Sequence, residues 1–465
     1  MKNIVFINPY ISDFAAYNLW AKPIGLLRSA SLFKELGFNV KVIDVLDVFD
    51  IELSKYTKIK IEKYHTSKYP KKKISIPETY KKIGIERDYF LYGFPEKLFI
   101  KKLKNISKPD LFILNSIMTY WYLGVEYTIK IIKSIYPDTP IILIGIYASL
   151  CYEHAIKYFK KYNVEVIPSS SINSNSSLNY ILKKFLNYNK YVEIKNTPPI
   201  YYEDYNIMKY GVIQTITGCP FNCDFCASKI LSKFKLIEKD TIYKDFQTLF
   251  RKKVKDIAFY DDSLLYRKNE HFIPIMETIK DKIKERNIRF HLPNSAHARY
   301  IDRKIAQIFK ELNFKTIRIS LESISNEFYE IMDKKVTKQH IIDAIRNMEE
   351  SGIDKRNIEV YLMYGVPGEN IKDIYEGMKF LFDLGVKIYL SDFAIVPKTK
   401  MAKVFPEWVL KEPLYHNNSI FPKRFIDKSF DENIYKEIHN TALWLNHGIE
   451  KGIKHIKIDL KNHAL

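Results

Sequence analysis

Short apolar runs alternate along the first third of the chain with longer segments whose apolar residues recur every three or four positions. The short runs are typical of buried strands and the periodic segments of amphipathic helices. Strands are predicted at 3–8, 39–43, 110–115, 141–145 and 164–167, and helices at 23–36 and 123–136. Alternation of this kind predicts an α/β fold with a doubly wound parallel sheet, because helices connect parallel strands.

The second half of the chain repeats the strand and helix alternation six times. Its apolar runs lie near 211–217, 256–261, 288–293, 316–321, 357–364 and 388–395, with amphipathic segments between them. Six such pairs match the count of a partial (βα)6 barrel, the fold that the family resemblance given below implies. The carboxyl ends of barrel strands carry the active site, so candidate residues are sought there.

The length of 465 residues exceeds one ordinary hydrophobic core and indicates two domains with an extension. The expected order is an α/β domain at 1–168 with a basic insertion at 51–108, a polar linker at 169–205, the barrel at 206–397 and a carboxyl-terminal cap at 398–465. The cap contains a predicted helix at 432–451.

The net charge of +20 is concentrated in the insertion, which has 16 Lys and Arg against 6 Asp and Glu. We interpret it as a solvated basic segment; an acidic partner is the alternative, and nucleic acid is not an expected partner. No run approaches the 18 apolar residues of a membrane span, and the first residues predict a strand instead of a signal peptide. A soluble, cytoplasmic protein without membrane contact is therefore expected.

Three of the four cysteines, Cys219, Cys223 and Cys226, have the spacing C-x3-C-x2-C. Three thiolates can bind three irons of a [4Fe-4S] cluster and leave the fourth iron without a protein ligand. The alternatives are a disulfide or a structural zinc, although the next histidine, His271, is outside the usual spacing of zinc ligands. The fourth cysteine, Cys151, is expected to be a small buried hydrophobic residue.

With Phe225 just before the last cysteine, the motif resembles that of the radical S-adenosylmethionine (radical SAM) enzymes, and the resemblance covers about 206–397. It implies that S-adenosylmethionine binds the open iron and that an external donor such as a flavodoxin or ferredoxin supplies an electron. A 5'-deoxyadenosyl radical then takes a hydrogen atom from a small-molecule or peptide substrate.

The first domain resembles the cobalamin-binding-like domain that precedes many radical SAM modules. The matching stretches are 23–26, 109–124 and 140–154. The D-x-H-x-x-G motif is absent, and Ile144 stands where relatives tend to have a second glycine. Cobalamin binding and a domain that has lost the cofactor therefore both stay open.

The predicted fourth barrel strand places Ile317, Ile319 and Leu321 on one face and Arg318, Ser320 and Glu322 on the other. The resemblance places Ser320 and Glu322 against the ribose and the methionine part of S-adenosylmethionine, and Arg318 and Phe225 are also candidate cofactor-binding residues. An internal salt bridge between Arg318 and Glu322 is the alternative.

Other strand ends add further candidates. The resemblance places Asp261 and Asp262 near the cofactor's amino group and Gly365 and Val396 near its adenine; a helix cap and ordinary loop chemistry are the alternatives. Lys335 and Lys338 could neutralise the cofactor carboxylate, although a solvated helix start is the preferred interpretation. After the third strand, His291, Asn294 and His297 are candidates to move protons at a substrate. A buried histidine with satisfied hydrogen bonds is the alternative there.

The main hypothesis is therefore a radical SAM enzyme, with methyl transfer as the chemistry if cobalamin binds. Without cobalamin, rearrangement, epimerisation and cyclisation are equally open. A non-catalytic iron-sulfur electron carrier and an RNA-associated protein are the rival classes.

Overall fold

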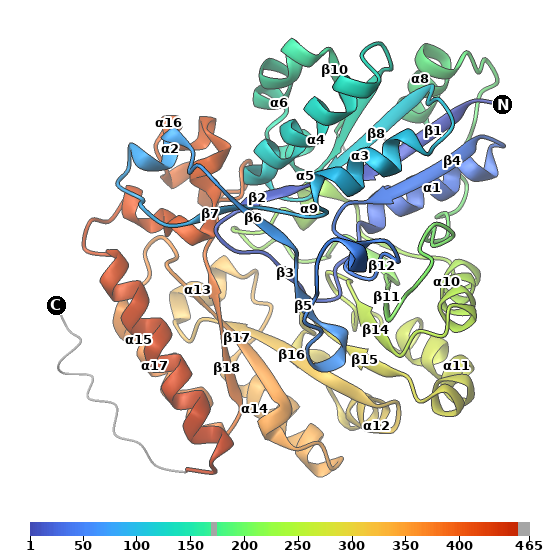
Figure 1. The fold of residues 1–465 in the computed structure, drawn as a ribbon. Helices are drawn as coiled ribbons and strands as arrows, with labels where there is room; N and C mark the ends of the chain where they lie inside the picture. The colour runs from blue at the N-terminus through green and yellow to red at the C-terminus, as the bar shows by residue number, and fades with distance from the viewer. Residues whose placement is uncertain (169–173, 454–465) are drawn as a thin grey trace. The chain divides into compact units, whose positions relative to one another are not determined.

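The computed structural model describes residues 1–168 and 174–453, which fall into two compact units (Figure 1). Unit 1 comprises Met1–Val212, Asp240–Val254 and Trp408–Asn417, and unit 2 comprises Ile213–Lys239, Lys255–Glu407 and the chain from Asn418. Of the predicted linker, 169–173 lie outside the described residues, and the remainder belongs to unit 1 and contains helix α8 (Asn175–Leu186). Residues 454–465 of the predicted cap also lie outside the description.

Unit 1 contains a five-stranded parallel sheet, as predicted. Its strands are β1 (Asn3–Asn8), β4 (Asn39–Asp44), β8 (Leu111–Ser116), β9 (Ile141–Gly145) and β10 (Val164–Val166). The connecting helices include α1 (Ile24–Glu35), α4 (Tyr122–Ile135), α5 (Ile146–Leu150) and α6 (Tyr152–Phe159). The order β10-β9-β8-β1-β4 changes direction between β1 and β8, and ligands of such sheets bind at that point.

The basic insertion is folded and has apolar residues of its own. It contributes β5 (Ser67–Lys68), β6 (Lys71–Ile74), α2 (Glu78–Lys81), β7 (Tyr89–Tyr92) and α3 (Glu96–Lys104). Strands β6 and β7 form an antiparallel sheet with β2 (Ile11–Asp13). Tyr69 and Tyr92 of the insertion join Ile11, Leu46 and Val48 in one buried cluster, so the insertion adds to the core while its lysines on β6 are exposed.

Unit 2 contains the predicted partial barrel. The sheet order is β11-β14-β15-β16-β17-β18, and the chain passes from unit 1 to unit 2 within β11. The strands are β11 (Tyr210–Ile213), β14 (Asp256–Phe259), β15 (Arg289–His291), β16 (Phe314–Glu322), β17 (Ile358–Tyr364) and β18 (Lys387–Asp392). The helices of the repeats are α11 (Phe272–Arg286), α12 (Arg303–Glu311), α14 (Lys338–Glu350) and α15 (Ile371–Leu384) in unit 2, and α10 (Lys239–Arg251), which belongs to unit 1 from Asp240 onward.

The carboxyl-terminal helix α17 (Glu432–Glu450) completes the edge of this sheet. The side chain of Asn446 accepts from the Ile388 amide at 2.8 Å and donates to its carbonyl at 2.8 Å, so it satisfies part of the free edge of β18. Among the helices of the described chain, none is long and apolar enough to cross a membrane.

Candidate functional site

The three cysteines lie on a loop that follows the short strand β12 (Ile216–Thr217). All three are free thiols; Cys219 and Cys223 are partly buried and Cys226 is exposed. The disulfide considered from the sequence is therefore not formed. Gly218 precedes the loop with φ of 65°, and a side chain there would meet the Ser232 and Lys233 backbone. The turn into the loop thus requires glycine.

The cysteine loop is docked on the turn 331–335, which follows α13 (Asn326–Ile331). The Cys223 thiol donates to the Met332 carbonyl at 3.3 Å, and the Asp224 amide donates to the Ile331 carbonyl at 3.0 Å. The backbone N–H of Asn222 donates to Asp333 Oδ2 at 2.9 Å. Asp333 and Lys334 both have positive φ, and this conformation turns the chain sharply beneath the loop.

A second element holds the same loop from the segment after β18. Lys400 Nζ lies 2.8 Å from Asp224 Oδ1, and the Met401 amide donates to the Asp224 carbonyl at 2.9 Å. Asp224, between the last two cysteines, therefore connects the loop to two parts of unit 2.

The donor set of this loop fits an iron-sulfur cluster. In the described residues, no group of three or more His, Cys, Asp or Glu side chains is arranged around one metal position. The thiolates of a cubane cluster bind different irons and need not converge on one point. Burial raises the pKa of the Cys223 thiol to about 12 and also raises that of Cys219, so cluster binding must displace thiol protons.

Lys335 lies buried beside this loop, which the sequence-based interpretation of a solvated helix start did not predict. Its side chain is 9% exposed, and its Nζ is 3.6 Å from Glu322 Oε1. Burial disfavours the charged form of Lys335 and so lowers its pKa. The Glu322 carboxylate and the nearby cysteines outweigh this effect and raise the pKa of Lys335 above its usual value. Lys338, by contrast, is exposed at the start of α14. The apolar neighbours Met332 and Val336 were the available signal that this segment is buried.

The polar residues of β16 have other partners than predicted. Arg318 pairs with Glu359 at 2.6 Å and Glu322 with Lys335, so the alternative of an Arg318–Glu322 salt bridge is wrong. Ser320 Oγ lies 2.5 Å from Ser295 Oγ. The register with β17 shifts between Ser320 and Glu322, and Glu322 has φ of 66°, so the regular alternation ends before Glu322.

Asp261 binds the backbone at the start of β12, the strand that leads into the cysteine loop. Its Oδ1 accepts from the Thr215 amide at 2.7 Å, the Thr215 hydroxyl at 2.8 Å and the Ile216 amide at 2.6 Å. Its Oδ2 is buried without a hydrogen-bond partner, and burial raises the pKa of Asp261 to about 7. Asp262 is exposed. Neither caps α11, which begins at Phe272, so the helix-cap alternative is wrong.

The three candidates after β15 have different surroundings. His291 is fully buried, with Nε2 2.9 Å from Asp256 Oδ1 and Nδ1 3.0 Å from Thr316 Oγ1. Because both ring nitrogens are occupied, the proposed proton-transfer role of His291 is not supported, and the buried alternative applies. Asn294 is exposed and donates to the Tyr260 carbonyl at 3.3 Å.

His297 is the candidate of this group that borders the cysteine loop. It is 5% exposed, and its ring packs edge-on against Phe221 with centroids 5.2 Å apart. Its Nδ1 is buried without a hydrogen-bond partner. Burial, with Lys335 and Arg299 nearby, holds the pKa of His297 well below its usual value, so the ring is neutral.

The remaining candidates lie at loop positions. Phe225 stacks on Phe328 of α13 with centroids 6.1 Å apart. Gly365 has φ of 77°, and a side chain there would overlap the Tyr435 hydroxyl of α17. The Val396 carbonyl accepts from the Thr399 hydroxyl at 2.7 Å. These contacts show local packing, and contact with a cofactor stays a prediction for all three.

In unit 1, a small pocket lies where the strand order changes direction. It is lined by Asn8, Pro9, Tyr10, Ile11, Leu46, Asn115, Ser116, Ile117, Trp121 and Val125. The lining contains no imidazole that could bind cobalt.

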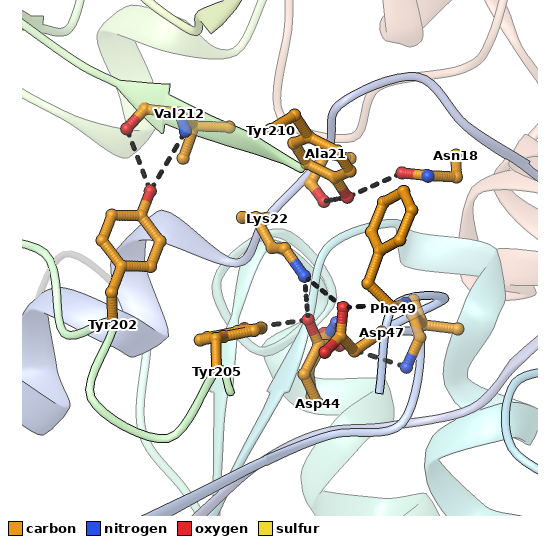
Figure 2. Close-up of polar contacts among 12 residues, drawn as sticks. Asn18, Ala21, Lys22, Asp44, Asp47, Phe49, Tyr202, Tyr205, Tyr210 and Val212 are labelled. Carbon is orange, nitrogen blue, oxygen red and sulfur yellow. Dashed lines mark hydrogen bonds and ion pairs between the residues drawn. The ribbon is translucent and has the colours of Figure 1, made fainter. Parts of the chain in front are cut away.

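A buried polar network fills the neighbouring strand end. Figure 2 shows Lys22 Nζ between two carboxylates, at 3.2 Å from Asp44 Oδ2 and 3.0 Å from Asp47 Oδ1. The Tyr205 hydroxyl donates to Asp44 Oδ2 at 2.8 Å, and the Asn8 amide donates to Asp44 Oδ1 at 2.7 Å. Since Asn8 also lines the pocket, this network fixes one of its walls.

The barrel contains the part of the chain that matches a known protein family. Residues 213–381 match the Radical SAM superfamily model. The radical SAM methyltransferase TsrM from Kitasatospora setae, solved with tryptophan and a SAM analog, has a TM-score of 0.60 at 13% identity, covering 86% of this chain and 75% of TsrM. The cobalamin-dependent SAM radical enzyme OxsB has a TM-score of 0.56 at 16% identity, covering 91% of this chain and 56% of OxsB. At these identities the likeness shows the fold across both units.

Curated relatives match a shorter part of the chain. An uncharacterized methyltransferase of Pyrococcus horikoshii is 25% identical over 180 residues, which are 38% of each chain. The ribosomal protein uS12 methylthiotransferase RimO of Clostridium botulinum is 24% identical over 177 residues, 37% of this chain and 40% of RimO. This chain therefore spans less than half the length of these relatives.

Proposed function

We propose, from the radical SAM domain that residues 213–381 form, that the protein is an enzyme that cleaves S-adenosylmethionine and removes a hydrogen atom from its substrate. A [4Fe-4S] cluster supplies this chemistry when bound: one electron from an external donor breaks a carbon-sulfur bond of S-adenosylmethionine, which releases methionine and a 5'-deoxyadenosyl radical. The observation that carries the proposal is the loop of three free thiols held by the turn 331–335.

The residues around the loop have distinct tasks in this proposal. Cys219, Cys223 and Cys226 hold the cluster. The unpartnered Oδ2 of Asp261 accepts a hydrogen bond from the ammonium group of S-adenosylmethionine, and Ser320 contacts its ribose. Gly365 and Val396 border the adenine.

The decisive experiment is anaerobic reconstitution followed by incubation with S-adenosylmethionine and a chemical reductant. The wild type should bind iron and sulfide and form 5'-deoxyadenosine and methionine. Cys219→Ala, Cys223→Ala and Cys226→Ala should each lose the cluster, whereas Cys151→Ala, which changes a buried cysteine of unit 1, should keep it. A wild-type cluster that does not cleave S-adenosylmethionine would leave an electron carrier instead.

Methyl transfer is the second, finer proposal. It is supported by the fold likeness to TsrM and OxsB over both units. No step is assigned to cobalamin here, because the pocket at the strand reversal of unit 1 has no imidazole in its lining that could bind cobalt. Extraction of cobalamin from anaerobically purified protein tests the proposal: a stoichiometric amount supports methyl transfer, and its absence favours rearrangement, epimerisation or cyclisation.

A further inference from the structure

The turn 331–335 brings a buried positive charge to the cysteine loop. The Met332 carbonyl accepts two hydrogen bonds, one from the Cys223 thiol at 3.3 Å and one from the Lys335 amide at 3.2 Å. The backbone N–H groups of Asp224 and Asn222 also hold this turn, at the Ile331 carbonyl and at Asp333 Oδ2, and these two bonds need no thiol proton, so they remain when the thiolate binds iron. Any movement of the turn would move the lysine and the cysteine together.

The other charges near the loop are arranged differently. Lys400, 66% exposed, pairs with Asp224, and Lys334, 63% exposed, pairs with Glu330 at 3.4 Å. Solvent screens such pairs strongly. Lys335 is 9% exposed, and its partner Glu322 is 11% exposed at 3.6 Å, a distance longer than that of a good hydrogen-bonded ion pair. Its field therefore extends to neighbouring groups with little screening.

We propose that Lys335 is a positioning residue that supplies the buried counter-charge of the cysteine loop and thereby makes its iron-sulfur cluster easier to reduce. The inference rests on the proposed function, because it assumes that the loop binds the cluster. Three thiolates in a partly buried loop repel one another, and an added electron increases the negative charge. A fixed ammonium beside them stabilises the reduced form more than the oxidised form. The Glu322 carboxylate has the opposite effect, so Lys335 and Glu322 together set how easily the cluster is reduced.

The experiment measures the midpoint potential of the reconstituted cluster by redox titration without S-adenosylmethionine. Lys335→Met should make the midpoint potential more negative by at least 59 mV, which corresponds to a tenfold change in the equilibrium constant of a one-electron reduction. Lys335→Arg should stay close to wild type. Lys334→Met is the matched control, because it removes the same charge one residue away at an exposed position and should leave the potential unchanged.

Glu322→Gln provides a test of opposite sign. Removing this carboxylate leaves the Lys335 charge uncompensated, so the potential should become less negative. If the Lys335→Met protein does not assemble a cluster, the sign of the shift in midpoint potential caused by Glu322→Gln tests the counter-charge inference by itself. A role of Lys335 in folding alone would lower the thermal midpoint of the cluster-free Lys335→Met protein without moving either potential.

The outcomes separate the two proposals. Equal potentials for wild type, Lys335→Met and Glu322→Gln would overturn the counter-charge inference while S-adenosylmethionine cleavage by the wild type upholds the proposed function. A wild type that binds a reducible cluster but leaves S-adenosylmethionine intact would overturn the proposed enzyme, and the potentials would still test Lys335.

Discussion

Arg318 on β16 and Glu359 on β17 form an ion pair between directly opposed residues of neighbouring strands, with Nε 2.6 Å from Oε2. The Arg318 guanidinium also lies over the Tyr389 ring, 4.2 Å from its centroid. Arg318 was predicted to bind the cofactor. That contact stays a prediction, and the observed contacts of Arg318 connect three adjacent strands of the barrel, because Tyr389 lies on β18.

Replacing Arg318 should therefore affect stability. In Arg318→Met, Glu359 loses its partner in a partly buried setting. We expect a loss of about 1–3 kcal/mol, less than for a fully buried pair because the Glu359 side chain is 28% exposed. Thermal unfolding of the cluster-free protein measures it. The exposed pair Arg346–Asp343 supplies the control Arg346→Met, for which about 0–1 kcal/mol is expected. Equal losses would refute the assignment.

Gly365 and Gly368 form a matched pair for backbone strain. Both have positive φ, but a Cβ at Gly368 meets nothing within 4 Å, whereas one at Gly365 overlaps Tyr435. Gly368→Ala should cost about 1–2 kcal/mol from φ alone, and Gly365→Ala about 1–3 kcal/mol more from overpacking. Adding Tyr435→Phe to Gly365→Ala should recover part of that extra loss, since it removes the overlapping hydroxyl. Identical thermal midpoints for the two alanine variants would contradict this account.

Lys22 should be essential to the stability of unit 1. Lys22→Met leaves Asp44 and Asp47 without their buried cation, and we expect a loss of about 3–5 kcal/mol. Lys41→Met is the control, because Lys41 pairs with Asp204 at 2.6 Å but is 48% exposed, and a loss of about 0–1 kcal/mol is expected. Chemical denaturation followed by tryptophan fluorescence measures the difference, because three of the four tryptophans, Trp20, Trp121 and Trp408, lie in unit 1. A Lys22→Met protein as stable as Lys41→Met would show that the network is dispensable.

The buried Asp261 should make stability depend on pH. Burial raises its pKa from 3.8 to about 7, so between these values the folded protein holds a proton that the unfolded chain has lost. Stability from this group therefore decreases as pH rises from about 4 to about 7. Asp261→Asn should remove that decrease in denaturation curves of the cluster-free protein recorded across this range. Asp427→Asn should change the pH dependence in the opposite sense, because a hydrogen bond from Ser429 lowers the pKa of Asp427.

The elements and the cysteine loop could be predicted from the sequence because they depend on local patterns. The apolar run 3–8 forms β1 with the predicted bounds, and the parallel sheet and partial barrel have the expected strands. The insertion at 51–108 was less predictable. Its lysines indicated solvent, and they are exposed on β6, but Tyr69 and Tyr92 join a core with residues far away in the sequence.

The partners of charged side chains could not be predicted. Alternation along β16 predicted that Arg318 and Glu322 lie on the same face of the strand, but a register shift and a positive φ at Glu322 redirect its carboxylate to Lys335. His291 had a plausible position for chemistry, and only the fold shows that Asp256 and Thr316 occupy both of its nitrogens.

The amino-acid order alone determined the three-thiol motif and the two α/β modules, because spacing and periodicity act over a few neighbouring residues. The tertiary structure decided which buried charges meet: Lys335 with Glu322 beside the thiols, and Lys22 with Asp44 and Asp47. Ion pairs form across space between segments that packing brings together, so their partners depend on register, turn geometry and burial, which no local pattern contains.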